Sequence, residues 1–225
     1  IDHAGGAGYL LKELPSARVV VAERGVGTLA DPGRLLASAR RALGTIADLY
    51  GDMAPIAENR VLAAEGLVSI DLGGRALRLV PTPGHATTHI CVVDEETRTL
   101  FSGDALGIFL ADEGKVLPVT PLPDFDLEEQ RLSMQRVAGL GCERTCFAHF
   151  GCGGATADLA RESLRNMELM VEAVKDAMRR EEDPARTAGE LMRIMEVNSP
   201  YGMFMFGGMS LQNVHGIRRY LGRSG

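Results

Sequence analysis

The middle of the chain contains two hairpin patterns in its order of apolar and polar residues. Residues 67–70 and 76–80 are largely apolar stretches on either side of Gly73 and Gly74, a pair that suits the positive φ angles of a tight turn. Residues 90–93 and 99–101 form a second pair of apolar stretches around a short polar turn. The pattern therefore predicts two consecutive antiparallel hairpins.

Helix and strand patterns alternate on both sides of these hairpins. Asp31-Pro32 predicts a helix start, because Asp is a common N-cap and Pro is favoured at the first helical position. Asp126 is expected to cap another helix, which runs to Ala138 and carries two glutamates in its first turn. The other expected elements are a helix over residues 8–14 and strands over residues 18–22 and 144–148. This alternation is typical of an α/β fold.

Only helical patterns follow Ala155. We therefore expect a core over residues 1–154 and a helical C-terminal extension over residues 155–225 that packs on it. Ser210 is expected to cap the last helix, which ends at Gly222. The preceding segment, residues 201–206, is rich in Met and Phe and is interpreted first as core packing, with a substrate-pocket wall or a dimer surface as alternatives.

Composition narrows the classes of partner. The chain has 225 residues, of which 45% are hydrophobic, so it can bury a sizeable core. Its net charge of −6, with Lys and Arg scattered, argues against a nucleic-acid surface. No apolar run approaches the ~20 residues of a membrane span, and no signal-peptide pattern opens the chain. We predict a cytoplasmic protein that binds a small-molecule substrate and neither nucleic acid nor membrane, with a homodimer left open.

Five residues that commonly bind metals lie at the ends of expected strands or the starts of expected helices. Asp2 and His3 open the chain, His85 follows Pro83-Gly84, Asp104 follows a strand, and His149 follows another. Imidazole nitrogen and carboxylate oxygen are ligands that zinc, iron and manganese accept. Each residue alone would be interpreted as structural. Together they favour a site for one or two divalent ions.

Two further histidines and four cysteines lie outside this set. His89 is interpreted as a supporting or structural residue near His85, and His215 as a helix-surface residue with a pocket role as the alternative. The cysteines are Cys91, Cys142, Cys146 and Cys152, and the last three surround His149 as C-x3-C-x2-H-x2-C. A structural zinc knuckle is one interpretation of that spacing, but reduced, buried thiols are favoured.

The order Asp-His, Pro-Gly-His, Ser-Gly-Asp and His resembles the motifs of the metallo-β-lactamase superfamily over residues 1 to 150. Asp2 and His3 match the end of its first motif, and His85, Asp104 and His149 match the later ones. The His-x-His pair that begins the first motif is not in the sequence. The resemblance implies an αββα sandwich, and we expect the chain to begin part-way through this fold, without the early strands. It also implies that the second metal position is complete and that the first lacks two ligands.

The same resemblance implies a metal-dependent hydrolase of a small ester, thioester, lactone or phosphodiester, similar to the glyoxalase II-like branch. A metal-bound hydroxide would be the nucleophile, Asp104 would bridge two ions, and Asp2 would ligate metal and act catalytically on the water. The implied cofactor is one or two zinc ions, with iron or manganese as alternatives. Two other functions stay open: an iron-dependent oxidoreductase resembling persulfide dioxygenases, and a non-catalytic binding protein.

Overall fold

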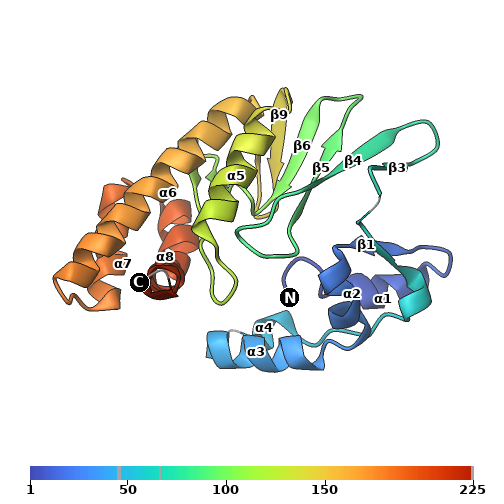
Figure 1. Cartoon of the computed structure of the whole chain (residues 1–225), viewed down its shortest axis with the longest axis horizontal. Helices are drawn as coiled ribbons and strands as arrows, with labels where there is room; N and C mark the ends of the chain where they lie inside the picture. The colour runs from blue at the N-terminus through green and yellow to red at the C-terminus, as the bar shows by residue number, and fades with distance from the viewer. Residues whose placement is uncertain (45–46, 66, 224–225) are drawn as a thin grey trace. The chain divides into compact units, whose positions relative to one another are not determined.

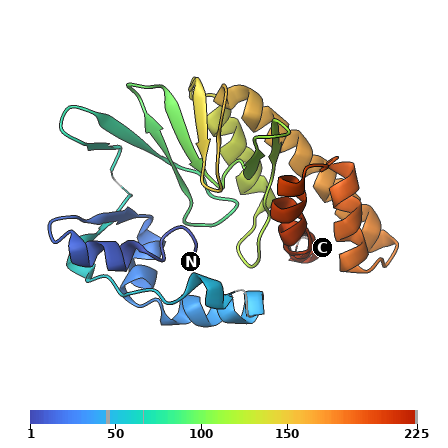
Figure 2. The same cartoon turned by 180° about the vertical axis from the view of Figure 1, so that it is seen from behind.

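The computed structural model describes residues 1–44, 47–65 and 67–223. Its contacts divide the chain into two compact units, Ile1–Val68 and Ser69–Gly225. Figures 1 and 2 show the two units from opposite sides. Each unit is described by itself. The sequence-based boundary between residues 154 and 155 stays a prediction.

The first unit consists of short helices around a small parallel strand pair. Its elements are α1 (Ala7–Glu13), β1 (Val19–Val21), α2 (Glu23–Ala30), α3 (Gly33–Leu43), α4 (Ala47–Tyr50), the 3-10 helix η2 (Glu58–Arg60) and β2 (Val61–Ala63). Strands β1 and β2 are parallel, with Val19 opposite Val61. The Arg60 guanidinium donates to carbonyls of Leu11, Leu14 and Ala17. Because these donors satisfy carbonyls at and after the end of α1, they fix where that helix stops.

The structure differs from the sequence predictions at two places in this unit. Helix α2 was not predicted, because its glycines at positions 25 and 27 weaken the helical pattern. The helix expected to begin at Pro32 begins at Gly33, where Asp31 Oδ1 accepts the Gly33 N–H at 3.2 Å. The predicted helix over residues 8–14 and the strand over residues 18–22 are confirmed as α1 and β1.

The second unit is built on a mixed six-stranded sheet. Its strands are β3 (Ser69–Asp71), β4 (Ala76–Pro81), β5 (Ile90–Asp94), β6 (Thr99–Gly103), β9 (Arg144–Phe147) and β10 (Cys152–Gly153), in the spatial order β10-β9-β6-β5-β4-β3. Both predicted hairpins are confirmed, and Gly73 and Gly74 have φ angles of 83° and 100°. A separate antiparallel pair, β7 (Ile108–Leu110) and β8 (Lys115–Leu117), follows β6.

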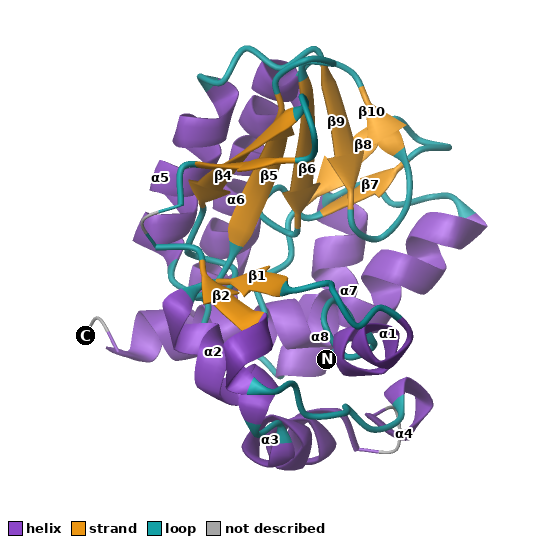
Figure 3. Cartoon of the chain, turned by 90° about the vertical axis from the view of Figure 1, so that its right-hand side faces the viewer, coloured by secondary structure: helices purple, strands orange, loops and turns teal. Residues whose placement is uncertain are grey.

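Helices cover one face of this sheet, as Figure 3 shows for α5 (Leu127–Ala138) and α6 (Thr156–Arg179). Apolar side chains from these helices and from the strands form one buried core, which includes Leu100, Met134, Met167 and Val171. Asp126 caps α5 as predicted, with its Oδ1 accepting the Glu129 N–H at 3.0 Å. The α/β class expected from the sequence is confirmed.

Two more helices complete the unit, α7 (Pro184–Ile194) and α8 (Pro200–Arg223). Helix α8 begins ten residues before the predicted Ser210. Ser199 is its N-cap, since the Ser199 Oγ accepts the Gly202 N–H at 2.9 Å, and Pro200 takes the first helical position. The Met- and Phe-rich segment is therefore helical. Phe206 is fully buried, as the core interpretation requires, while Phe204 is 78% exposed.

No helix within the described ranges has both the length and the apolar character needed to span a membrane.

Candidate metal centre

The ends of three strands bring candidate ligands to one edge of the six-stranded sheet. Strands β4 and β6 both pair antiparallel with β5, and β6 pairs parallel with β9. Strands β4, β6 and β9 therefore point the same way, and their carboxyl ends meet at the same edge. His85 follows β4, Asp104 follows β6 and His149 follows β9. Three of the five residues that were predicted to share one sheet edge, His85, Asp104 and His149, therefore lie at the same edge of this sheet.

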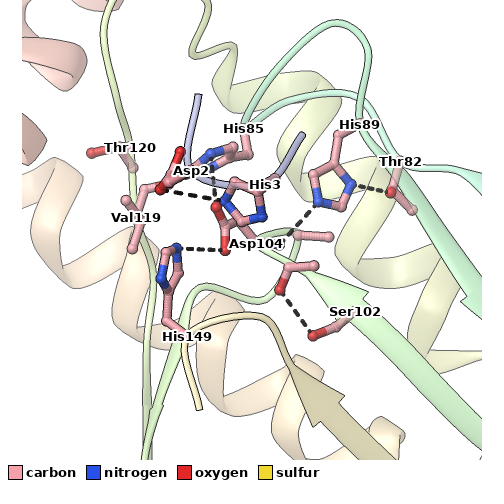
Figure 4. Close-up of polar contacts among 12 residues, drawn as sticks. Asp2, His3, Thr82, His85, His89, Ser102, Asp104, Val119, Thr120 and His149 are labelled. Atoms are coloured by element: carbon pink, nitrogen blue, oxygen red, sulfur yellow. Dashed lines mark hydrogen bonds and ion pairs between the residues drawn. The ribbon is translucent and has the colours of Figure 1, made fainter. Parts of the chain in front are cut away.

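The two imidazoles lie on either side of the Asp104 carboxylate, as Figure 4 shows. His85 Nε2 is 3.4 Å from Asp104 Oδ2, and His149 Nε2 is 3.4 Å from Asp104 Oδ1. The exposed fractions of the side chains are 6% for Asp104, 14% for His85 and 27% for His149. The carboxylate is therefore the most buried of the three groups, and His149 is the most exposed.

A backbone carbonyl orients the His85 ring. His85 Nδ1 lies 3.1 Å from the Val119 carbonyl oxygen. A carbonyl can only accept, so Nδ1 carries the proton and donates it. In the neutral ring, Nε2 then presents a lone pair toward Asp104, which is the tautomer that a metal-binding histidine requires.

The peptide unit that holds His85 is itself clamped by α8. The Val119 carbonyl and the Thr120 N–H belong to one planar peptide group. That N–H donates to Asn213 Oδ1 at 2.8 Å, and Thr120 Oγ1 donates to the Asn213 carbonyl at 3.0 Å. Gly216 lets the helix approach, because a Cβ there would lie 1.8 Å from the Thr120 carbonyl oxygen. Helix α8 therefore fixes the plane of the group that orients His85.

His89 holds the backbone of Asp104 through a hydrogen bond. Its Nε2 accepts the Asp104 backbone N–H at 2.9 Å, so this nitrogen carries no proton. Its Nδ1 must then carry one, and it donates to Thr82 Oγ1 at 2.7 Å. Thr82 in turn donates to Cys91 Sγ at 3.3 Å. The network fixes a neutral His89 ring and confirms its predicted supporting role.

Glycine is required where His89 meets the end of β6. Gly103 has a φ of 50°, and a Cβ at this position would lie 2.5 Å from His89 Nε2. A side chain there would displace the imidazole from the Asp104 N–H. Burial raises the pKa of the nearby Cys91 thiol to about 12, although the Thr82 hydrogen bond opposes the shift. Cys91 is therefore a hydrogen-bonding thiol rather than a nucleophile.

Helix α5 holds the His85 and Asp104 loops together. Its Gln130 Nε2 donates to the Ala105 carbonyl, and its Ser133 Oγ donates to the Pro83 carbonyl at 2.6 Å. Gly84 has a φ of 132°, and a Cβ there would lie 2.4 Å from the Gln130 Cα. The glycine of the Pro-Gly-His sequence is thus needed for the loop to pack against α5.

His149 lies in the turn between β9 and β10. The Phe147 N–H donates to the Gly151 carbonyl at 3.1 Å and closes this turn. Tyr201 Oη, from α8, donates to the His149 carbonyl at 3.1 Å. Phe150 has a φ of 93°, a conformation that is uncommon for a bulky residue and is found at turns and functional sites.

Asp2 and His3 lie in the first unit. Asp2 Oδ2 is 3.6 Å from His3 Nε2. The side chains are 36% and 44% exposed. In the same unit, burial raises the pKa of Tyr50, and the Asp2 charge adds to the shift. Their assignment as ligands, and the catalytic role of Asp2, stay predictions from the sequence.

The remaining histidine and the cysteines follow the predictions in part. His215 is exposed on α8, as expected. The four cysteines are free thiols, and Cys91 and Cys142 are buried. Cys146 is half-buried and Cys152 is exposed, because β10 is the edge strand of the sheet. The expectation that all four are buried is wrong for these two.

Sequence reasoning missed most of the partners that hold the ligands. The proline-rich loop over residues 118–123 borders the site, because its Val119 carbonyl contacts His85. Asn213 and Gln130 gave no signal, since a lone polar residue in a helix is usually solvated. Their burial, at 0% and 2% exposed, is what reveals their role.

Comparison with known proteins agrees with this architecture. The sequence profile of the Metallo-beta-lactamase superfamily matches residues 1–149. A metallo-beta-lactamase fold-containing protein of Sulfurisphaera tokodaii is 33% identical over 172 residues, which are 73% of this chain and 59% of that protein. An acyl-coenzyme A thioesterase of Gallus gallus is 33% identical over 101 residues, 45% of this chain and 35% of that protein. The chain thus spans less than two thirds of the length of either relative.

Solved structures show the same fold. The crystal structure of an archaeal metallo-beta-lactamase superfamily protein from Sulfolobus tokodaii matches with a TM-score of 0.70 and 25% identity, covering 93% of this chain and 73% of that one. A metallo-beta-lactamase family protein of Thermus thermophilus matches with a TM-score of 0.70 and 21% identity, covering 99% and 71%. Since the profile match runs from the first residue through all three strand-end residues to His149, the chain belongs to the metallo-beta-lactamase superfamily.

Proposed function

We propose that this chain is a metal-dependent hydrolase of a small ester, thioester, lactone or phosphodiester. The observation that carries the proposal is the placement of His85 and His149 on the two oxygens of one buried carboxylate, at 3.4 Å each. Superfamily membership supports the reaction class. The name of the Gallus gallus relative, an acyl-coenzyme A thioesterase, supports the inclusion of thioesters.

The three side chains of the second unit fit a divalent ion. Two imidazole nitrogens and a carboxylate make a donor set that zinc, iron and manganese accept. His85 is held in the required tautomer by the Val119 carbonyl. His85, Asp104 and His149 would hold one or two ions, and Asp2 and His3 are further ligands according to the family resemblance alone.

A bound divalent ion supplies Lewis acidity, which brings the pKa of a coordinated water toward ~7 and polarises a carbonyl or phosphoryl oxygen. The chain's own contribution is orientation. Asp104 is held by the His89 ring at its backbone N–H, while α5 holds the Ala105 carbonyl that follows. The ligands are therefore positioned before a substrate arrives, which lowers the reorganisation that the reaction needs. Because His149 is the most exposed of the three, a substrate would approach from its side.

The test combines metal content with hydrolysis. The purified chain is loaded with zinc, iron or manganese, its metal content is measured by elemental analysis, and it is assayed with a nitrophenyl ester, an acyl thioester, a lactone and a phosphodiester. Asp104→Ala should lose both metal and activity. The isosteric Asp104→Asn serves if the alanine variant does not fold.

Asp94→Ala is the matched control, because Asp94 is also a buried aspartate of this sheet but binds Arg75 and Thr97. Asp94→Ala should keep both the metal content and the hydrolytic activity. Full metal retention in Asp104→Asn would refute the assignment of the site. Metal without hydrolysis of any of the four substrates would refute the hydrolase proposal and favour a binding function.

A further inference from the structure

Cys146 and Cys152 face each other across the hairpin that carries His149. They are opposite partners in the antiparallel register of β9 and β10, and their Sγ atoms lie 2.8 Å apart. The next pair along the hairpin, Phe147 and Gly151, is a hydrogen-bonded pair, because the Phe147 N–H donates to the Gly151 carbonyl. The adjacent cysteine pair is therefore non-hydrogen-bonded, the kind of pair in which Cα atoms are only ~4.5 Å apart and side chains are closest.

We propose that Cys146 and Cys152 form a reversible intramolecular disulfide that closes the hairpin around His149. A disulfide needs Cα atoms about 4.4–6.8 Å apart and sulfur atoms about 2.05 Å apart. The observed separation of the sulfur atoms exceeds the length of a disulfide bond by less than about 1 Å. Rotation of the side chains can therefore form the bond while the strands stay paired. This modification site goes beyond the proposed hydrolysis and does not depend on it.

Access distinguishes this pair from the other two cysteines. Cys152 is exposed on the edge strand, whereas Cys91 and Cys142 are 0% and 5% exposed. Burial raises the pKa of Cys146 to about 11, and the hydrogen bond with Cys152 adds to the shift. An oxidant in solution therefore meets Cys152 first, and Cys146 stays a thiol beside it.

The chemistry balances with a peroxide as the oxidant. The Cys152 thiolate attacks one peroxide oxygen, the O–O bond breaks, and hydroxide leaves, which gives a sulfenic acid at Cys152. The Cys146 sulfur then attacks the Cys152 sulfur, the S–O bond breaks and water leaves with the Cys146 proton. Two thiols and one hydrogen peroxide thus become one disulfide and two waters. A dithiol reductant restores both thiols by exchange.

The bond would restrain the residue at the top of the hairpin. His149 lies midway between the two cysteines in sequence, and its carbonyl is already held by Tyr201 Oη. A covalent closure at the base adds a second restraint on the turn. We expect amide hydrogen exchange of residues 147–151 to slow in the oxidised chain, with no change at β3, which lies at the opposite edge of the sheet.

The arrangement of tryptic sites allows a direct test. Arg144 and Arg161 bound a peptide, residues 145–161, that contains both cysteines of the pair, while Cys91 and Cys142 fall in residues 79–98 and 137–144. The full chain is treated with hydrogen peroxide, denatured, alkylated with N-ethylmaleimide, digested and analysed by mass spectrometry. The peptide 145–161 should lose two hydrogens and take no maleimide. The other two cysteine peptides should take one maleimide each.

Two variants serve as controls. Cys142→Ala should form the same bond at the same rate, and Cys152→Ser should leave Cys146 fully alkylated. A dithiol reductant should restore two maleimides on the wild-type peptide. The proposal is overturned if both cysteines of that peptide remain alkylated after peroxide. It is also overturned if Cys152→Ser lowers the metal content of the reduced chain, because the thiols would then be metal ligands.

Discussion

Replacing Asn213 with alanine should weaken metal binding. Asn213 lies in α8, a helix that contains none of the candidate ligands. Asn213 Oδ1 accepts the Thr120 N–H at 2.8 Å, and both residues are fully buried. The same peptide plane presents the Val119 carbonyl to His85 Nδ1 at 3.1 Å. Loss of the amide side chain therefore frees the plane that fixes the His85 ring.

The magnitudes follow from these contacts. A buried N–H left without an acceptor costs about 1–3 kcal/mol, so Asn213→Ala should lower the free energy of unfolding by about 2 kcal/mol. The bond from Thr120 Oγ1 to the backbone of residue 213 stays, which keeps the loop near α8. Loss of the direct partner of a metal-binding histidine typically lowers metal affinity about 10–100-fold. Asn213 holds the peptide group of that partner, so Asn213→Ala should lower metal affinity by about 10-fold, the lower end of this range.

Urea unfolding and metal competition with a chelator of known affinity measure the two effects separately. Val174→Ala is the control, because Val174 is fully buried in α6 and its truncation should cost about 2 kcal/mol by lost burial and cavity formation. It should leave metal affinity unchanged. Thr120→Val, which keeps the N–H, should also retain affinity. If Asn213→Ala binds metal no more weakly than Val174→Ala at equal stability loss, orientation of His85 through the shared peptide plane is refuted.

Two further changes test other parts of the second unit. Burial raises the pKa of Glu113, but hydrogen bonds from Ser199, Lys115 and Asn198 outweigh it and lower the pKa from 4.5 to about 2. The stabilisation by the Glu113 carboxylate is therefore complete above pH ~4.5 and lost toward pH ~2. In urea unfolding, Glu113→Gln should have a lower free energy of unfolding than the wild type near neutral pH, and this difference should disappear in acid. A difference that does not change with pH would contradict this. Gly103→Ala adds strain at positive φ of about 1 kcal/mol and displaces His89, so unfolding and metal assays should both show losses; wild-type values would contradict the close contact.

Local sequence signals determined much of the second unit. Gly73 and Gly74 predicted the first hairpin because only a few residues accept positive φ at a turn. Asp126 predicted the start of α5, because capping depends on residues within one helical turn. The strand-end placement of His85, Asp104 and His149 also followed from the sequence, since each motif directly follows an apolar strand.

Elements that depend on distant burial were missed. Helix α8 begins at Pro200 although Gly207 and Gly208 interrupt its apolar pattern, because Phe206, Val214 and Ile217 are buried in the core of the second unit. Strand β8 has only three residues and pairs with β7, and its pattern alone is too short to distinguish from a loop.

The sequence by itself determined which side chains could bind metal and that three of them follow strands. Only the tertiary structure decided what holds them. The Val119 carbonyl, Asn213 and His89 act through hydrogen bonds between residues 15 to 93 positions apart along the chain. Local propensity carries no information about such pairs, because they form only when the sheet, α5 and α8 have packed. The same holds for the cysteine pair, whose spacing was visible but whose facing register came from the pairing of β9 with β10.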